Sequence, residues 1–141
     1  MVDTVSRKTC YNVGMAVDIR PYSELDEDSL FAMIRAEGAE WKDYHGEKYK
    51  KALHNSTVFV AYNNDELVGF VRCKNDDGFG VYIYDLLVAP KSRGQNLGRA
   101  LMEKVCTAFP GNTVYVMSDV DEYYSKQGYP RIGSIFLVVS G

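Results

Sequence analysis

A basic segment that contains glycine, VAPKSRGQNLGRALM at residues 88–102, carries the clearest chemical signal in the chain. Its positive charges come from Lys91, Arg93 and Arg99, in a chain whose formal net charge is −3. Gly94 and Gly98 permit a positive φ or a close approach of the backbone to a ligand. A strand that ends in such a loop and continues into a helix directs backbone N–H groups and the positive end of the helix dipole into one small space. The pattern predicts a phosphate site, and the alternative is a loop whose glycines only turn the chain.

Reactive side chains of other kinds are few. The chain has eleven Tyr but only two His and three Cys, which argues against a His-rich metal site or a disulfide framework. The basic loop lacks the G-K-[ST] ending of a P-loop and is not G-x-G-x-x-G. Acid–base chemistry would therefore depend on carboxylate, tyrosine or backbone groups.

The elements that must position these residues follow from hydrophobic spacing and turn residues. Strands are predicted at residues 15–20, 57–62, 66–73, 79–88, 112–118 and 133–140. Helices are predicted from a capping box at Ser23 and Asp26 to Gly38, within 40–53, at 97–109 and at 122–127. The strand, helix and strand around the basic loop form a βαβ unit, which makes its two strands parallel. The layout is mixed α/β.

The run DLLVAPKSRGQNLGRALM, followed by YYSKQGY, resembles the GNAT superfamily of acetyl-CoA-dependent N-acetyltransferases. The order of the elements over residues 15–139 also matches that fold. One position departs, because Asn96 stands at the central glycine of the family loop. Asn tolerates left-handed backbone well, so the loop can keep its shape. The resemblance implies one α/β domain over residues 15–141, with a central mixed sheet flanked by helices. Residues 1–14 are polar and aperiodic, and we expect them to form a leader strand or an N-terminal arm.

The resemblance also implies cofactor contacts. In the family, backbone N–H groups of the loop hold the pyrophosphate of coenzyme A, a role that falls here on Arg93, Gly94, Gln95, Asn96, Leu97, Gly98 and Arg99. The main chain of Leu87 and Val88 would pair with the pantetheine arm. The Val88 N–H would also donate to the oxyanion of the tetrahedral intermediate that forms when an amine attacks the thioester directly.

Tyr124, four residues before Gly128, matches the family tyrosine that protonates the departing thiolate. A thiol with a pKa near 8.5 and a phenol with one near 10 can share a proton as the C–S bond breaks. The alternative is that Tyr124 only packs beside Tyr123.

Asp85 is the carboxylate best placed to act as a base toward the amine, because it lies within an apolar strand where acids are rare unless paired. It could instead be a structural acid that accepts backbone hydrogen bonds at a bulge.

Acceptor specificity is expected from Glu37, Glu40, Trp41, Tyr44 and the adjacent His45. Carboxylates and aromatic rings suit a cationic or aromatic amine, whereas the alternative is a helix-capping cluster with a packed Trp. The expected function is transfer of an acetyl group from acetyl-CoA to a primary amine on a small molecule or peptide. The alternatives are a non-catalytic acyl-CoA-binding or sensing module on the same fold, and an α/β interaction domain without a ligand.

Composition bounds the other partners. The chain has no basic excess, so a nucleic-acid partner is not expected. No metal is expected either, and no apolar run is suited to a signal peptide or a membrane span. Cys10, Cys73 and Cys106 match no metal or disulfide spacing, which favours the reducing cytoplasm, and Cys73 and Cys106 are predicted to be buried. The chain is expected to be a monomer or a homodimer, in which the leader and the final strand could form the contact.

Overall fold

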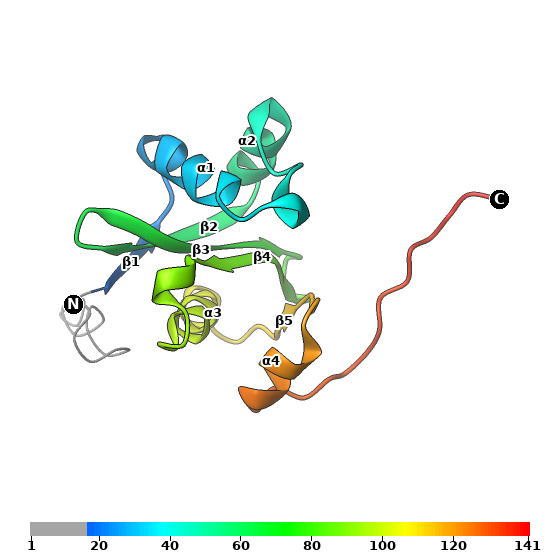
Figure 1. Cartoon of the computed structure of the whole chain (residues 1–141). Coiled ribbons are helices and arrows are strands. Elements are labelled where there is room, and N and C mark those ends of the chain that lie inside the picture. The colour runs from blue at the N-terminus through cyan, green and yellow to red at the C-terminus, as the bar shows by residue number, and fades with distance from the viewer. Residues whose placement is uncertain (1–16) are drawn as a thin grey trace.

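Two helical layers enclose one twisted sheet in the computed structural model, which describes residues 17–141 (Figure 1). The strands are β1 (Val17–Pro21), β2 (Thr57–Asn63), β3 (Glu66–Asn75), β4 (Val81–Val88) and β5 (Val114–Val116). The α-helices are α1 (Glu27–Arg35), α2 (Gly46–His54), α3 (Leu97–Ala108) and α4 (Asp121–Lys126). Short 3-10 turns lie at Glu24–Asp26, Ala39–Trp41 and Pro90–Ser92. The predicted mixed α/β fold is confirmed, and the predicted arm at 1–14 lies outside the described residues.

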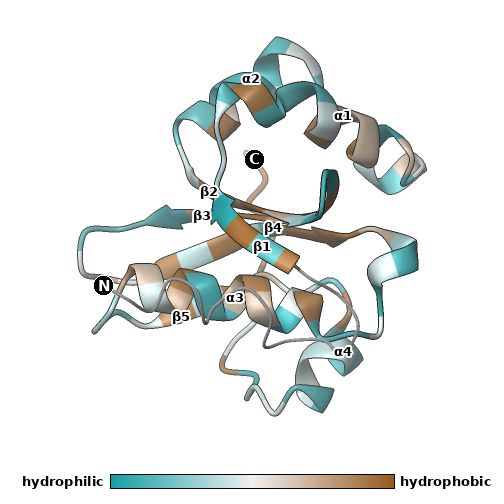
Figure 2. Ribbon diagram, turned by 90° about the vertical axis from the view of Figure 1, so that its left-hand side faces the viewer, coloured by the Kyte–Doolittle hydropathy of each residue, from teal (hydrophilic) through white to brown (hydrophobic). Residues whose placement is uncertain are grey.

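The sheet has the order β1-β2-β3-β4-β5, with antiparallel pairs up to β4 and a parallel β4–β5 pair. The parallel pair confirms the predicted βαβ unit, since α3 crosses between the two strands. Figure 1 shows α1 and α2 on one face of the sheet and α3 on the other. The apolar strands lie between these layers (Figure 2), and the buried side chains form two clusters, one on each face.

A bulge at Tyr84 reverses the side-chain alternation of β4. Arg72 of β3 is opposite Asp85 and Cys73 is opposite Ile83, so Tyr84 has no partner of its own in the β3–β4 ladder. An extra residue in one strand shifts every later side chain to the other face. Ile83 consequently packs toward α3, whereas Asp85, two residues later, faces α2, where Tyr49 donates to it.

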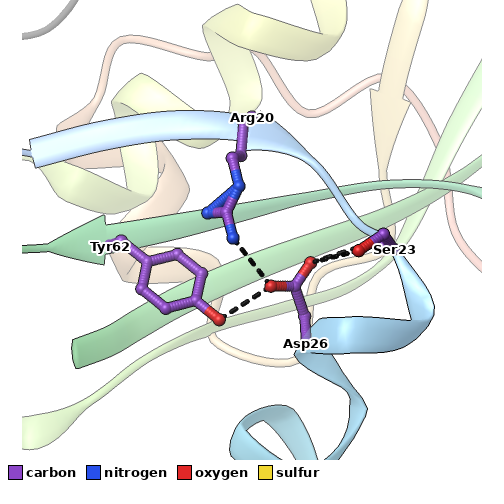
Figure 3. Close-up of polar contacts among 4 residues, drawn as sticks. All are labelled: Arg20, Ser23, Asp26 and Tyr62. Carbon is purple, nitrogen blue, oxygen red and sulfur yellow. Dashed lines mark hydrogen bonds and ion pairs between the residues drawn. The ribbon is translucent and has the colours of Figure 1, made fainter. Parts of the chain in front are cut away.

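The first helix begins at a buried carboxylate. The backbone N–H of Ser23 donates to Oδ2 of Asp26 at 2.8 Å, as the predicted capping box requires, while Arg20 and the hydroxyl of Tyr62 each donate to Oδ1 at 2.8 Å (Figure 3). The Asp26 side chain is thereby satisfied although it is 1% exposed. Its contacts join β1, the start of α1 and β2, so we assign the cluster to the stability of the fold.

Two expectations fail. The predicted strand at 133–140 is wrong, because residues 129–141 form no strand and run away from the body (Figure 1). Its composition favours a strand, but a strand forms only where another strand offers backbone partners. Cys73 is buried as predicted, but Cys106 is exposed, because it lies off the face of α3 that carries Leu101 and Val105 into the core.

Candidate functional site

The parallel pair β4–β5 opens after three residues. Val81, Tyr82 and Ile83 pair with Val114, Tyr115 and Val116. The N–H of Met117 then donates to the Ile83 carbonyl at 3.1 Å. Within the described residues, the rest of β4, from Asp85 to Val88, pairs only with β3. The strands therefore diverge and leave one edge of β4 accessible.

Backbone groups of Val88 face this open edge. The N–H of Ala89 donates to the carbonyl of Val68 on β3 at 2.9 Å. Since successive residues direct their backbone groups to opposite edges of a strand, Val88 and Leu86 face away from β3. The side chain of Arg93 agrees with this geometry, because its Nε donates to the Val88 carbonyl at 2.9 Å. Leu87, which was predicted to share this role, directs its main chain toward β3 and its side chain into the core under α1 and α2.

The basic loop lines a cavity of about 510 Å³ at the open edge. The predicted residues that border this larger cavity are Val88, Arg93, Gly94, Asn96, Leu97, Gly98 and Tyr124. Sequence reasoning did not select the other lining residues, which are Leu86, Ser92, Asp119, Val120, Tyr123 and Gln127. Leu87, Gln95 and Arg99 are not among the lining residues.

The backbone of the loop has the conformations that an anion cradle needs. Gly94 has φ +77°, and Asn96 lies in the left-handed region with φ 63° and ψ 18°, as predicted for the residue that replaces the family glycine. Asn96 precedes the first residue of α3, whose first turn contains no acidic residue. The first N–H groups of a helix lack partners within it and carry the positive end of its dipole. This end of α3 can therefore accept a phosphate.

Gly98 lets another side chain come close to the start of α3. The hydroxyl of Tyr123 lies where a Cβ at this position would stand, so a side chain here would have to displace it. The bare backbone, the left-handed residues and the helix end together fit the pyrophosphate of coenzyme A.

All three basic residues of the segment already have partners, and Lys91 forms an ion pair with Glu66 of β3. Arg93 donates to Oε1 of Glu37 at 2.7 Å as well as to Val88, and thus joins the loop to the segment after α1. Arg99 donates to Glu103 at 2.9 Å and to the Gln127 carbonyl at 3.2 Å. Arg99 therefore holds α3 against the end of α4. Glu37 lines neither cavity, and its side chain is 10% exposed.

A smaller cavity, of about 100 Å³, adjoins the larger one. Its acidic residues are Glu40, Asp85 and Asp119, and its aromatic residues are Trp41, Tyr44, Tyr84 and Tyr124. Trp41 packs edge-on against Phe70 with ring centroids 6.1 Å apart and also lines the cavity. Both interpretations of this aromatic residue, packing and substrate contact, are therefore compatible with its position. His45 is exposed before α2 and does not line the cavity.

Tyr124 belongs to the wall that separates the two cavities, together with Leu86 and Asp119. Burial, and then the charge of Asp119, raises the pKa of Tyr124 to about 12. The phenol consequently keeps its proton near neutral pH, as an acid must. The structure brings Tyr124 beside the predicted loop although the two are about 30 residues apart in the sequence.

Asp85 forms one side of a buried ion pair. Its Oδ2 accepts a hydrogen bond from the hydroxyl of Tyr49 at 2.6 Å and from Nε of Arg72 at 2.5 Å. Arg72 donates in turn to Ser56. Burial and the Asp85 carboxylate raise the pKa of Tyr49 far above its ordinary value. Asp85 lies beside the bulge at Tyr84 and is held by two side-chain donors. This arrangement favours a structural acid over a free base, although the donors are side chains and not the backbone groups expected from the sequence.

The comparisons with known proteins specify the family to which a chain with this fold and this pair of cavities belongs. The Acetyltransferase (GNAT) family model matches residues 22–129, and the chain belongs to this family. The N-acetyltransferase ycf52 of Pyropia yezoensis, itself described as uncharacterized, is 29% identical over 92 residues, which cover 58% of this chain and 53% of the relative. The GCN5-related N-acetyltransferase 2, chloroplastic, of Arabidopsis thaliana is 36% identical over 69 residues, 45% of this chain and 27% of the relative.

A solved structure supports the same fold. An aminoglycoside N-acetyltransferase in complex with CoA superposes with a TM-score of 0.71 at 12% identity, over 91% of this chain and 97% of that chain. At this identity the likeness concerns the fold alone. The chain spans about half the length of the first curated relatives it matches.

Among residues 17–141, none of the helices combines the length and the apolar character that a membrane span requires. Nor do the His, Cys, Asp and Glu side chains of that range form a group of three or more that could hold a metal ion.

Proposed function

We propose that the chain transfers an acetyl group from acetyl-CoA to a cationic primary amine. The observation that carries the proposal is the position of Tyr124, which borders both the larger cavity beside the basic loop and the smaller acidic cavity. One cavity would hold the cofactor and the other the acceptor, so the phenol would stand where the two meet. Membership of the family and the CoA complex of a fold neighbour support the choice of cofactor.

Each residue then has a chemical role. Acetyl-CoA supplies the activated acyl group. The N–H groups at the start of α3 hold the pyrophosphate, and the N–H of Val88 stabilises negative charge on the thioester oxygen during direct attack by the amine. Tyr124 donates its proton to the sulfur as the C–S bond breaks. Asp85, which lines the acceptor cavity, fixes Arg72 and Tyr49 behind it rather than acting as the base.

The acceptor class follows from the smaller cavity. Glu40 and Asp119 are exposed carboxylates, and the rings of Trp41 and Tyr44 lie beside them. Carboxylates and aromatic faces both attract a cation. An alkyl ammonium has a pKa near 10.4, so it arrives charged and must lose a proton before attack. Asp119, next to Tyr124, is a carboxylate that water could connect to that nitrogen.

The test is release of free thiol from acetyl-CoA in the presence of a panel of amines, with thermal shift by acetyl-CoA measured in parallel. We expect a rise in melting temperature and faster thiol release with cationic amines than with neutral aromatic ones. A thermal shift without thiol release for any amine would favour the non-catalytic acyl-CoA sensing module. No thermal shift would contradict the cofactor assignment. The cytoplasmic location stays a prediction, and the chloroplastic relative makes the compartment a matter for direct localisation.

A further inference from the structure

Arg99 contacts the end of the short helix that carries Tyr124. Its Nη1 donates to the carbonyl of Gln127 at 3.2 Å and to Oε1 of the same residue at 3.3 Å. The guanidinium also lies over the ring of Tyr129, 5.7 Å from the ring centroid. Gln127 is the C-cap residue of α4, and Tyr129 follows it by two residues. Arg99 therefore joins the first turn of α3 to the C-terminal end of α4.

The helix α4 depends on contacts of this kind for its position. It has six residues, or roughly one and a half turns, and a helix this short is not stable on its own in water. The ion pair of Lys126 with Glu122 and the hydrogen bond from Ser118 to Asp121 lie within the same segment. These contacts stabilise the helix but do not fix it to the rest of the protein. The hydrogen bonds from Arg99 do, because Arg99 belongs to another element.

The first turn of α3 is a firm base for this attachment. Leu101 and Val105 anchor α3 in the core, where both are 0% exposed. Glu103 accepts from Nε of Arg99 at 2.9 Å and thereby orients the guanidinium. Gly98, the preceding residue, also contacts α4, because the hydroxyl of Tyr123 lies where its Cβ would stand. Two consecutive residues of α3 thus receive α4, which lies on the same side of the sheet (Figure 1, Figure 2).

The position of Arg99 differs from that of a phosphate ligand. The family resemblance predicts a cofactor contact here, but the side chain lines neither cavity. Its donors are directed to Glu103 and Gln127 instead. The backbone at the start of α3 and the Arg99 side chain therefore serve different partners.

We propose that Arg99 is a positioning residue, which holds α4 so that the phenol of Tyr124 stays at the junction of the two cavities. Tyr124 and Gln127 are three residues apart, so they lie on neighbouring turns of one helix face. A shift of about 1 Å in a reacting group can lower a rate by about 100-fold. The inference rests on the proposed function for the role of Tyr124, whereas the attachment of α4 can be tested without catalysis.

The experiment compares Arg99→Ala and Arg99→Lys with the native chain. The matched control is Lys104→Ala, which removes a cation of the same helix whose Nζ lies 5.7 Å from the ring centroid of Phe59 on β2. The measurements are kcat in thiol release, the Kd of acetyl-CoA by calorimetry, and amide hydrogen exchange over residues 118–129 of the ligand-free protein. Arg99→Ala is also made in the Tyr124→Phe background.

We expect Arg99→Ala to lower kcat by about tenfold or more, with the Kd of acetyl-CoA within about twofold of the native value. Arg99→Lys should behave in the same way, because an ammonium lacks the planar fork that joins Glu103 to Gln127. In the Tyr124→Phe background the same change should lower kcat by less than about twofold, since the two residues act as a unit. Amide exchange in α4 should be about threefold faster in both Arg99 variants and unchanged in Lys104→Ala.

Three results would overturn the proposal. One is a Kd of acetyl-CoA that rises by about tenfold in Arg99→Ala at unchanged kcat and recovers in Arg99→Lys, which would make Arg99 a phosphate ligand. The second is an equal loss of kcat with and without the Tyr124 hydroxyl. The third is unchanged amide exchange in α4. A native chain that releases no thiol with any amine would contradict the proposed function instead, and the exchange rates would still decide whether Arg99 holds α4.

Discussion

Asp119 and Tyr124 lie together in the wall between the two cavities. Burial of the phenol, and after it the charge of Asp119, raises the pKa of Tyr124 to about 12 from an ordinary value of 10.0. A raised pKa keeps the phenol neutral and protonated at every pH below that value. The side chain is therefore protonated throughout the neutral and mildly alkaline range, which is the form that the proposed proton transfer to sulfur requires.

This pKa predicts the pH profile of the reaction. The rate at limiting amine should rise from about pH 7 toward pH 10, because the acceptor ammonium loses its proton over that range. Tyr124 should add no descending limb before about pH 12. The measurement is kcat/KM for the amine across this range. A fall in rate between about pH 8 and 10 that disappears in Tyr124→Phe would contradict the assignment.

Glu40→Gln should weaken the acceptor and spare the cofactor. Glu40 is exposed at the smaller cavity and lines no part of the larger one. Loss of one exposed ion pair costs about 0.2–1 kcal/mol, or roughly a one-and-a-half- to fivefold rise in KM for a cationic amine. KM for acetyl-CoA should stay the same. Asp65→Asn, at an exposed carboxylate in the β2–β3 turn, changes the net charge equally and should alter neither KM.

Gly98→Ala should reduce the affinity for acetyl-CoA by about tenfold or more, because a methyl group would keep the pyrophosphate from the start of α3. The added Cβ also meets the Tyr123 hydroxyl, so the variant could lose stability as well. The double variant G98A/Y123F removes that overlap and should regain melting temperature without regaining affinity.

Calorimetric titration with acetyl-CoA separates the two effects of Gly98→Ala. Gly133→Ala is the control, because a Cβ there meets nothing within 4 Å. Full affinity in Gly98→Ala would place the cofactor elsewhere.

The buried pair of Asp85 and Arg72 should dominate the stability of the acceptor wall. Asp85→Ala leaves a guanidinium whose side chain is only 15% exposed without its carboxylate, which typically costs about 3–5 kcal/mol. Tyr49→Phe removes one hydrogen bond to a charged group and should cost about 1.5–3 kcal/mol. Urea denaturation measures both values.

A further variant, Asp85→Asn, separates a positioning residue from a base. If Asp85 only positions its neighbours, Asp85→Asn should retain a pH profile of native shape at a reduced rate. A pH profile whose shape changes in Asp85→Asn would restore Asp85 as the base.

Much of the site could be predicted because its signals are local. The apolar spacing of Leu97, Leu101 and Val105 defines α3, and the tolerance of Asn96 for left-handed backbone follows from its own side chain. The loop and the helix start are adjacent in the sequence, so the cradle needs no tertiary information. Tyr124 was predicted only through the family motif that ends at Gly128 and Tyr129.

The remaining features depend on contacts between residues that are far apart in the sequence, which no local pattern predicts. Nothing in the run Val81–Val88 marks the bulge at Tyr84, which decides that Asp85 meets Arg72 and Tyr49. Arg93 and Arg99 carry the charge expected of phosphate ligands, yet their partners come from distant segments. Residues 133–140 have the composition of a strand but form none, because composition does not say whether another strand offers backbone partners.

The proton-donating role of Tyr124 is tested most directly by comparing Tyr124→Phe with Tyr123→Phe in thiol release from acetyl-CoA with a cationic primary amine. The two residues are adjacent, their rings lie 4.9 Å apart, and both line the larger cavity, but only Tyr124 also lines the smaller one. We predict that Tyr124→Phe lowers kcat by about 100-fold or more, with KM for acetyl-CoA nearly unchanged, whereas Tyr123→Phe keeps most of the native kcat. Equal rates for Tyr124→Phe and the native protein, or the larger loss in Tyr123→Phe, would contradict the account.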